Sequence, residues 1–190
     1  FDLQGELDGQ GKKENLARSL RGNFEFLARD GRIFRFRLLS RVIGYINLTE
    51  VFRAKLPDLG KEGLAYDSIT IKGNLRGGKL NLKEAILDGS TVEIVGEGEI
   101  DLTTEKMNLS LLVAPLKTVD SVVKKIPIVR GILGGTLISY PVKVRGDLAA
   151  PRVSALSPSA VGSELLGIMK RTFQLPVKIL KPLRPSGEKK

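Results

Sequence analysis

The strongest constraint on the fold is a run of alternating apolar and polar residues in the middle of the chain. From residue 69 to residue 75, Ile, Ile, Gly and Leu alternate with Thr, Lys and Asn. The same period of two recurs at 80–83, 92–101 and 107–113. A period of two places successive side chains on opposite faces of a β-strand. Because Asp88-Gly89 is a typical hairpin signal, we predict four consecutive antiparallel strands.

Other segments continue the strand pattern. Residues 1–7, 20–28 and 138–148 alternate in the same way. A Gly-polar-apolar phrase also recurs, beginning at Gly5, Gly22, Gly73, Gly98 and Gly146. Glycine inside a strand often marks a bulge or a bend, so five of them favour a curved sheet. The alternative is coincidence, since the chain has 21 glycines.

Three segments have helical spacing instead. Residues 34–55 carry apolar side chains such as Leu39, Val42 and Ile46 with arginines among them. Residues 116–133 repeat the pattern and end at Gly134-Gly135. The third helix follows a serine cap at 157 or 159 and runs to Phe173, and prolines in the tail make the rest irregular.

These patterns predict a mainly β fold with helical inserts (β+α): a curved antiparallel sheet that forms an apolar groove. A sheet with one aliphatic face must cover it with another layer. Two or three amphipathic helices could cover only part of that face, which would leave a trough open to acyl chains. The candidate lipid-binding residues are Ile69, Ile71, Leu80, Leu82, Val92, Ile94, Leu109, Leu111, Val142 and Val144. The alternative is that the helices cover the sheet fully and these residues are simply core.

The net charge of +10 is unevenly distributed. Residues 57–114 have 6 basic and 10 acidic residues, whereas 115–190 have 14 basic and 4 acidic. Basic helices with apolar faces suit either nucleic acid or an anionic membrane surface. No nucleic-acid-binding motif is present, so we expect no nucleic-acid partner. The candidate membrane-contact residues are Leu165, Leu166, Ile168, Met169, Lys170, Arg171 and Phe173. The alternative for this helix is docking on the sheet.

Signals for catalysis are poor. The chain has no cysteine and no histidine, which removes thiolate nucleophiles, imidazole bases and the usual zinc sites. Glu97, Glu99 and Asp101 share one strand face, which is typical of a solvated surface. Two Ser-x-x-Lys matches, at 121–124 and 186–189, lack the partner motifs that give that sequence meaning. We therefore expect a protein that is not an enzyme, with no catalytic residues, metal or cofactor.

The second half of the chain resembles a known family. The run Lys125 to Gly135, the strand from Tyr140 to Leu148 that ends in Gly-Asp-Leu, and the segment Pro151 to Ala160 stand in a characteristic order. This order is similar to that of the C-terminal region of AsmA-like envelope proteins, the AsmA/TamB/YhdP superfamily. The segment from Asp30 to Val113 is also similar, so the resemblance spans about residues 20–180.

The resemblance implies an envelope protein anchored in the inner membrane by an N-terminal helix. Its long β-groove would cross the periplasm and let phospholipid acyl chains pass toward the outer membrane. The chain begins at Phe1 without such an anchor, so we expect it to be the terminal part of a longer protein. We expect a groove domain at 1–150 with helical inserts at about 34–55 and 116–133. A C-terminal strand, an amphipathic helix and a basic proline-containing tail would occupy 151–190.

The leading hypothesis is therefore a non-enzymatic lipid-binding or lipid-conducting terminal domain that moves phospholipid between the inner and outer membranes. Its partners would be phospholipid acyl chains and an anionic membrane surface. The alternative is an envelope-assembly scaffold that docks a protein partner through a sheet edge. Crosslinking from the strand 138–148 would separate the two, because the first predicts lipid adducts and the second protein adducts.

Overall fold

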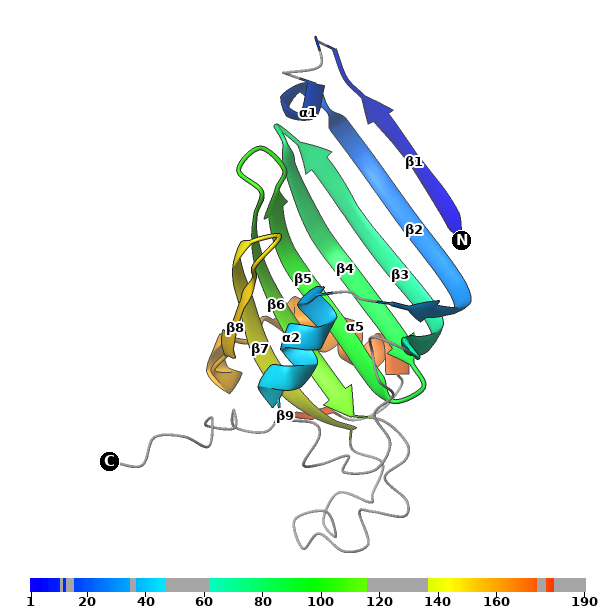
Figure 1. The fold of residues 1–190 in the computed structure, drawn as a ribbon, viewed down its shortest axis with the longest axis vertical. Coiled ribbons are helices and arrows are strands. Elements are labelled where there is room, and N and C mark those ends of the chain that lie inside the picture. The colour runs from blue at the N-terminus through cyan, green and yellow to red at the C-terminus, as the bar shows by residue number, and fades with distance from the viewer. Residues whose placement is uncertain are drawn as a thin grey trace, which may run out of the picture.

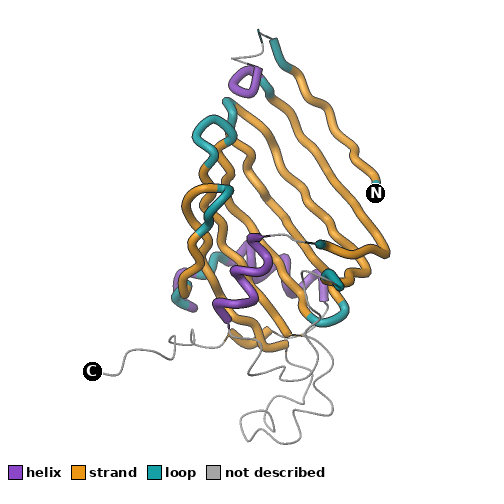
Figure 2. Tube along the Cα trace, in the orientation of Figure 1, coloured by secondary structure: helices purple, strands orange, loops and turns teal. Residues whose placement is uncertain are grey.

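The computed structural model describes residues 1–10, 12, 16–34, 37–46, 62–115, 137–173 and 177–179. Most of these residues lie in strands, with a few helices between and after them (Figure 2). The strands are β1 (Asp2–Asp8), β2 (Arg21–Ile33), β3 (Leu64–Arg76), β4 (Lys79–Gly89), β5 (Val92–Asp101), β6 (Lys106–Pro115), β7 (Leu137–Asp147), β8 (Arg152–Ala155) and β9 (Val177–Ile179). The helices are α1 (Leu16–Ser19), α2 (Arg37–Ile46), the 3-10 turn η3 (Pro158–Ala160) and α5 (Ser163–Phe173).

The sheet is open and mainly antiparallel. Strands β1 to β8 lie side by side in sequence order, each antiparallel to the next, and β9 pairs in parallel with β7 (Figure 1). The strands predicted from the alternation are therefore confirmed. The four-strand run corresponds to β3–β6, and the segments at 1–7, 20–28 and 138–148 correspond to β1, β2 and β7.

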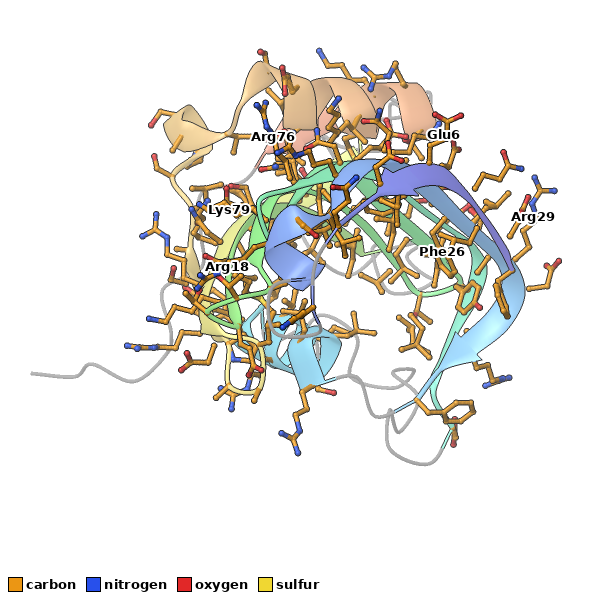
Figure 3. The ribbon with its side chains drawn as sticks, turned by 90° about the horizontal axis from the view of Figure 1, so that it is seen from above. Glu6, Arg18, Phe26, Arg29, Arg76 and Lys79 are labelled. Atoms are coloured by element: carbon orange, nitrogen blue, oxygen red, sulfur yellow. The ribbon has the colours of Figure 1, made fainter. Side chains whose placement is uncertain are left out.

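The sheet is curved when it is seen from above (Figure 3). Its two faces are called here the concave face and the convex face. Residues directly opposite one another in antiparallel strands point to the same face. In one such row, Gly5 lies opposite Phe24, and Phe24 lies opposite Gly73. All five glycines of the recurring phrase lie on the concave face, where missing side chains leave room for the large side chains beside them.

Two helices pack on opposite faces of the sheet (Figures 1 and 3). On the concave side, α2 buries Leu39, Val42, Ile43 and Ile46 in a cluster with residues of β3 and β5–β7. On the convex side, α5 buries Leu165, Ile168 and Met169 in a second cluster. The strand residues of that second cluster are Val95, Leu112 and Ala114. Each of the two helices therefore covers apolar side chains on one face of the sheet.

The helical predictions are confirmed only in part. The segment expected at 34–55 contains α2, which covers residues 37–46, while 47–61 lie outside the described residues. The insert expected at 116–133 also lies outside them, as does most of the tail beyond Phe173. The expected C-terminal helix is present as α5, and the short strand before it as β8.

Candidate functional site on the concave face

The concave face collects apolar side chains from all eight antiparallel strands. The row through Ile71 shows how: Ile71 lies between Phe26 and Ala85, and Ala85 faces Gly96. The row continues through Leu111 to Val142. By the same register, all ten residues predicted to line a groove point to this one face. A β-bulge between Leu82 and Ala85 keeps β4 in phase with its neighbours.

Helix α2 divides this face into two parts. Six of the ten predicted residues are buried in the cluster that α2 completes, and these are Val92, Ile94, Leu109, Leu111, Val142 and Val144. For these six, the alternative of ordinary core packing describes the structure, because they are buried in one cluster with the apolar residues of α2. The other four are partly exposed, and these are Ile69, Ile71, Leu80 and Leu82.

The uncovered part extends beyond the predicted residues onto β1 and β2. Leu3 and Leu7 of β1 are 66 % and 54 % exposed, and Phe24 and Phe26 of β2 are partly exposed. The Phe1 and Phe26 rings stack with their centroids 6.3 Å apart. The sequence signal for these residues was the same alternation that identified the central strands. We call the eight residues Leu3, Leu7, Phe24, Phe26, Ile69, Ile71, Leu80 and Leu82 the open apolar surface.

The convex face has the opposite character over the same strands. The Lys72 ammonium lies 3.0 Å from the Glu25 carboxylate, and the Asn81 amide donates to Asn74 at 3.1 Å. Lys79 and Glu99 pair at 2.8 Å. The two faces of β1–β4 therefore differ sharply in polarity, so that an apolar ligand is favoured on the concave side alone.

Arginines of α2 hold the helix to the turn after β7. Arg41 Nη1 donates to the Pro151 carbonyl at 3.0 Å, and Arg37 Nη1 donates to the Ala149 carbonyl at 3.5 Å. The arginines of this amphipathic segment thus bind backbone oxygens at the β8 side of the sheet. The apolar face of α2 is fixed beside the open apolar surface and not within it.

The acidic residues singled out on β5 lie on the convex face. Burial raises the pKa of Glu97, and the nearby Glu164 carboxylate raises it further, while Lys143 opposes the shift. Burial likewise lowers the pKa of Lys143, whose ammonium donates to the Ser110 hydroxyl at 2.9 Å. Within the described ranges, no group of three or more acidic side chains is placed to hold a metal ion. These groups lie at the start of α5, away from the concave face.

The structure places the candidate membrane-contact residues against the sheet. Leu165, Ile168 and Met169 of α5 are buried against the sheet, and Leu166 packs at the edge of the same cluster. The docking alternative therefore describes this helix. The remaining two described side chains, Lys170 and Arg171, are exposed, and Arg171 lies 3.4 Å from Glu84 on β4. The side chain of Phe173 lies outside the described residues.

A comparison with known protein families shows which family this chain belongs to. A family model described as YhdP protein matches residues 1–153, which span β1 to the start of β8. The chain belongs to the YhdP family. This match confirms the resemblance to AsmA-like envelope proteins, because the YhdP family is one of that group. No curated protein and no solved structure matches the chain.

The YhdP family match covers the whole open apolar surface and α2. It ends before α5 begins at Ser163. The YhdP family is an envelope protein family. No helix in the part of the chain that the structure describes is long and apolar enough to cross a membrane.

Proposed function

We propose that this chain is a non-enzymatic lipid-binding and lipid-conducting domain of a bridge-like envelope protein. Its ligand would be phospholipid acyl chains, which would lie along the concave face as in a groove. The longer protein would be anchored in the inner membrane and would move phospholipid across the periplasm to the outer membrane. Membership of the YhdP family supports the envelope setting.

The observation that carries the proposal is the open apolar surface. Its side chains come from four adjacent strands and are all at least partly exposed, and of the eight only Leu82 packs against the cluster that contains α2. Soluble proteins rarely leave a large contiguous apolar patch open to water, and such patches mark binding sites. Each acyl methylene that such a surface removes from water contributes roughly 0.8 kcal/mol.

The shape of the face also favours a chain-like ligand. The row of Gly5, Phe24, Gly73 and Leu82 alternates absent and large side chains across four strands. A flexible hydrocarbon chain needs apolar contact but no hydrogen-bond partner, and the eight residues of the open apolar surface supply contact alone. Polar headgroups would have to stay outside this surface, in water.

The proposal is tested by comparing two neighbouring residues that face opposite ways. A photoreactive benzoyl-phenylalanine replaces Ile71 on the concave face or Lys72 on the convex face of the same strand. After illumination with vesicles of labelled phospholipid, we expect crosslinked lipid on the first protein and not on the second. Native mass spectrometry of the unmodified chain should also find retained phospholipid. Equal labelling at both positions, or none at either, would contradict the proposal.

A second candidate function is docking of a protein partner through a sheet edge. The crosslinks that we expected from the strand 138–148 would not test it, because β7 is paired on both sides, with β6 and β8. The observation that favours this candidate is β8, which lies at the other end of the strand order and, among the described strands, pairs only with β7. Photocrosslinking from the outer edge of β8 is therefore the relevant experiment.

A further inference from the structure

A row of charged residues crosses the convex face at the end of the sheet where β3 turns into β4. In the strand register this row contains Arg21 of β2, Arg76 of β3 and Lys79 of β4, each directly opposite the next. Like charges directly opposite one another are destabilising. Three cations side by side therefore favour the binding of an anion between them.

The two arginines of this row have no anionic partner of their own. Lys79 pairs with Glu99 at 2.8 Å. In the described part of the chain, neither Arg21 nor Arg76 forms an ion pair or a side-chain hydrogen bond, and both are exposed. Strands β2 and β4 flank Arg76, so its cationic surroundings do not depend on what lies beyond β1.

The turn beside Arg76 is free of side chains. It consists of Gly77 and Gly78, whose φ angles of 61° and 79° suit glycine. Gly77 is exposed, and nothing lies within 4 Å of the β-carbon that it lacks. A phosphate group could therefore reach the guanidinium of Arg76 from the end of the sheet without a steric obstacle.

The row of cations adjoins the open apolar surface on the opposite face. The next row along the strands contains Leu7, Leu75 and Leu80 on the concave side, and Leu7 and Leu80 belong to the open apolar surface. Successive residues are roughly 3.4 Å apart along a strand. Seen from this end, Arg76 lies on the outer side of the sheet and Phe26 on the inner side (Figure 3). One molecule at this end could place acyl chains on the leucines and an anionic group at Arg76.

The opposite ends of the same strands carry a different charge. The convex row there contains Arg29, Ser68, Asp88 and Glu93, which are one cation and two acids. Phosphate is therefore favoured at the end with the β3–β4 turn and disfavoured at the other.

We propose that Arg21 and Arg76 bind the phosphate of a phospholipid whose acyl chains lie on the open apolar surface. A guanidinium binds phosphate oxygens through two parallel N–H donors, and such charge-assisted hydrogen bonds are stronger than neutral ones. The pair fixes the end of the strands at which the headgroup lies. This inference rests on the proposed lipid-binding function and adds the position of the headgroup to it.

The probes are dihexanoylphosphatidylglycerol below its micellar concentration and dihexanoylglycerol, which has the same acyl chains without the phosphate. Each is titrated calorimetrically into the 190-residue chain at low salt. We expect saturable binding of both ligands, because both present acyl chains. If the unmodified chain bound neither, the proposed lipid-binding function would fail together with this inference.

Two double variants of equal charge test the arginines themselves. Arg21→Gln with Arg76→Gln should bind the phospholipid roughly tenfold more weakly. It should bind dihexanoylglycerol as before, which also shows that the sheet is folded. Arg29→Gln with Lys170→Gln removes two exposed cations elsewhere and should bind both ligands as the unmodified chain does. An unchanged affinity of the first variant for phospholipid, an equal loss in both variants, or an equal loss for both ligands would overturn the inference and leave lipid binding intact.

Sodium phosphate distinguishes a lipid headgroup from a free anion. It should displace the phospholipid only at much higher concentration, because it lacks the acyl chains. If sodium phosphate bound the unmodified chain as tightly as the phospholipid, the arginines would serve a free anion and the headgroup assignment would be wrong.

A nitroxide label shows at which end the phosphorus lies, since the chain has no cysteine of its own. Thr104→Cys lies in the exposed turn after β5, where Leu102 N donates to the Gly78 carbonyl at 2.8 Å, and Ser90→Cys lies in the exposed turn before β5. The label at position 104 should broaden the phosphorus NMR signal of the bound phospholipid, and the label at position 90 should not. Equal broadening, or the reverse order, would overturn the inference.

Discussion

At the scale of single residues, glycine and phenylalanine shape the open part of the concave face. Phe24 lies between Gly5 and Gly73 on the neighbouring strands. A β-carbon added to Gly73 would lie 3.0 Å from Cε1 of Phe24 and would also meet the backbone oxygen of Asn81. The ring of Phe24 therefore occupies the space that a side chain at position 73 would need. Such glycine–aromatic pairs are a known device for curved sheets.

This arrangement predicts opposite effects for two glycine substitutions. Gly73→Ala should lower the free energy of unfolding by about 1–3 kcal/mol, because the backbone of β4 or the Phe24 ring must move. Gly44→Ala is the matched control. Gly44 is exposed within α2, with open space around its Cα, so alanine should raise the free energy of unfolding by about 0.5–1 kcal/mol. Urea unfolding of both variants measures the difference, and a loss of stability in both would contradict this account.

The residues on each face were predictable from the sequence, whereas their exposure was not. A period of two determines which side chains share a face, and the register places the ten groove candidates on one face of the sheet. Whether Leu111 or Ile71 is accessible depends on where α2 lies in space. That position is set by long-range contacts such as Arg41 with the Pro151 carbonyl, which no local pattern reveals.

At the scale of elements, α2 and α5 show why an amphipathic pattern does not identify a membrane helix. Both helices have one apolar face, and both bury it against the same sheet, from opposite sides. Helical periodicity predicts that an apolar stripe will be covered, without saying by what. The strand residues Val95, Leu112 and Ala114 supply the cover for α5. In the sequence, these three apolar residues are a weak sign that a helix docks there, since they only interrupt the otherwise polar face of β5 and β6.

The packing of α5 predicts a graded response along the helix. Leu165→Ala and Met169→Ala should each lower the free energy of unfolding by about 2–5 kcal/mol, because both side chains are fully buried. Lys170→Ala is the control and should change it by less than about 0.5 kcal/mol, since Lys170 is exposed. Chemical denaturation in the absence of lipid measures these effects. If all three variants were equally stable, α5 would not be docked on the sheet in solution.

At the scale of the whole molecule, the sheet combines a closed half and an open half on one continuous apolar face. The closed half is a core in the ordinary sense, with α2 packed over β5–β7. The open half is the open apolar surface on β1–β4, where the same kind of side chains stay at least partly exposed. An acyl chain on the proposed path would therefore meet α2 and could extend beyond it only if α2 moved away from the sheet.

This division predicts where an apolar probe can react. Because the chain has no cysteine, a single introduced cysteine reports on one position. Ile71→Cys lies in the open half and should react with a maleimide-bearing fatty acid, whereas Leu111→Cys is buried in the cluster with α2 and should be strongly protected. Mass spectrometry of the adduct gives both rates. Equal rates at the two positions would show that α2 does not close this part of the face.

The contacts of α2 with the turn after β7 should control how well α2 protects the face beneath it. Arg41→Ala removes the 3.0 Å hydrogen bond to the Pro151 carbonyl. A hydrogen bond of this kind contributes about 1 kcal/mol, so its loss should raise the reaction rate of Leu111→Cys by roughly fivefold and leave that of Ile71→Cys unchanged. Arg37→Ala is the matched control, because its contact with the Ala149 carbonyl is longer, at 3.5 Å, and should have a smaller effect. A similar rise at both cysteines would indicate general unfolding and not release of α2, and α2 would then have no separate part in limiting the acyl path.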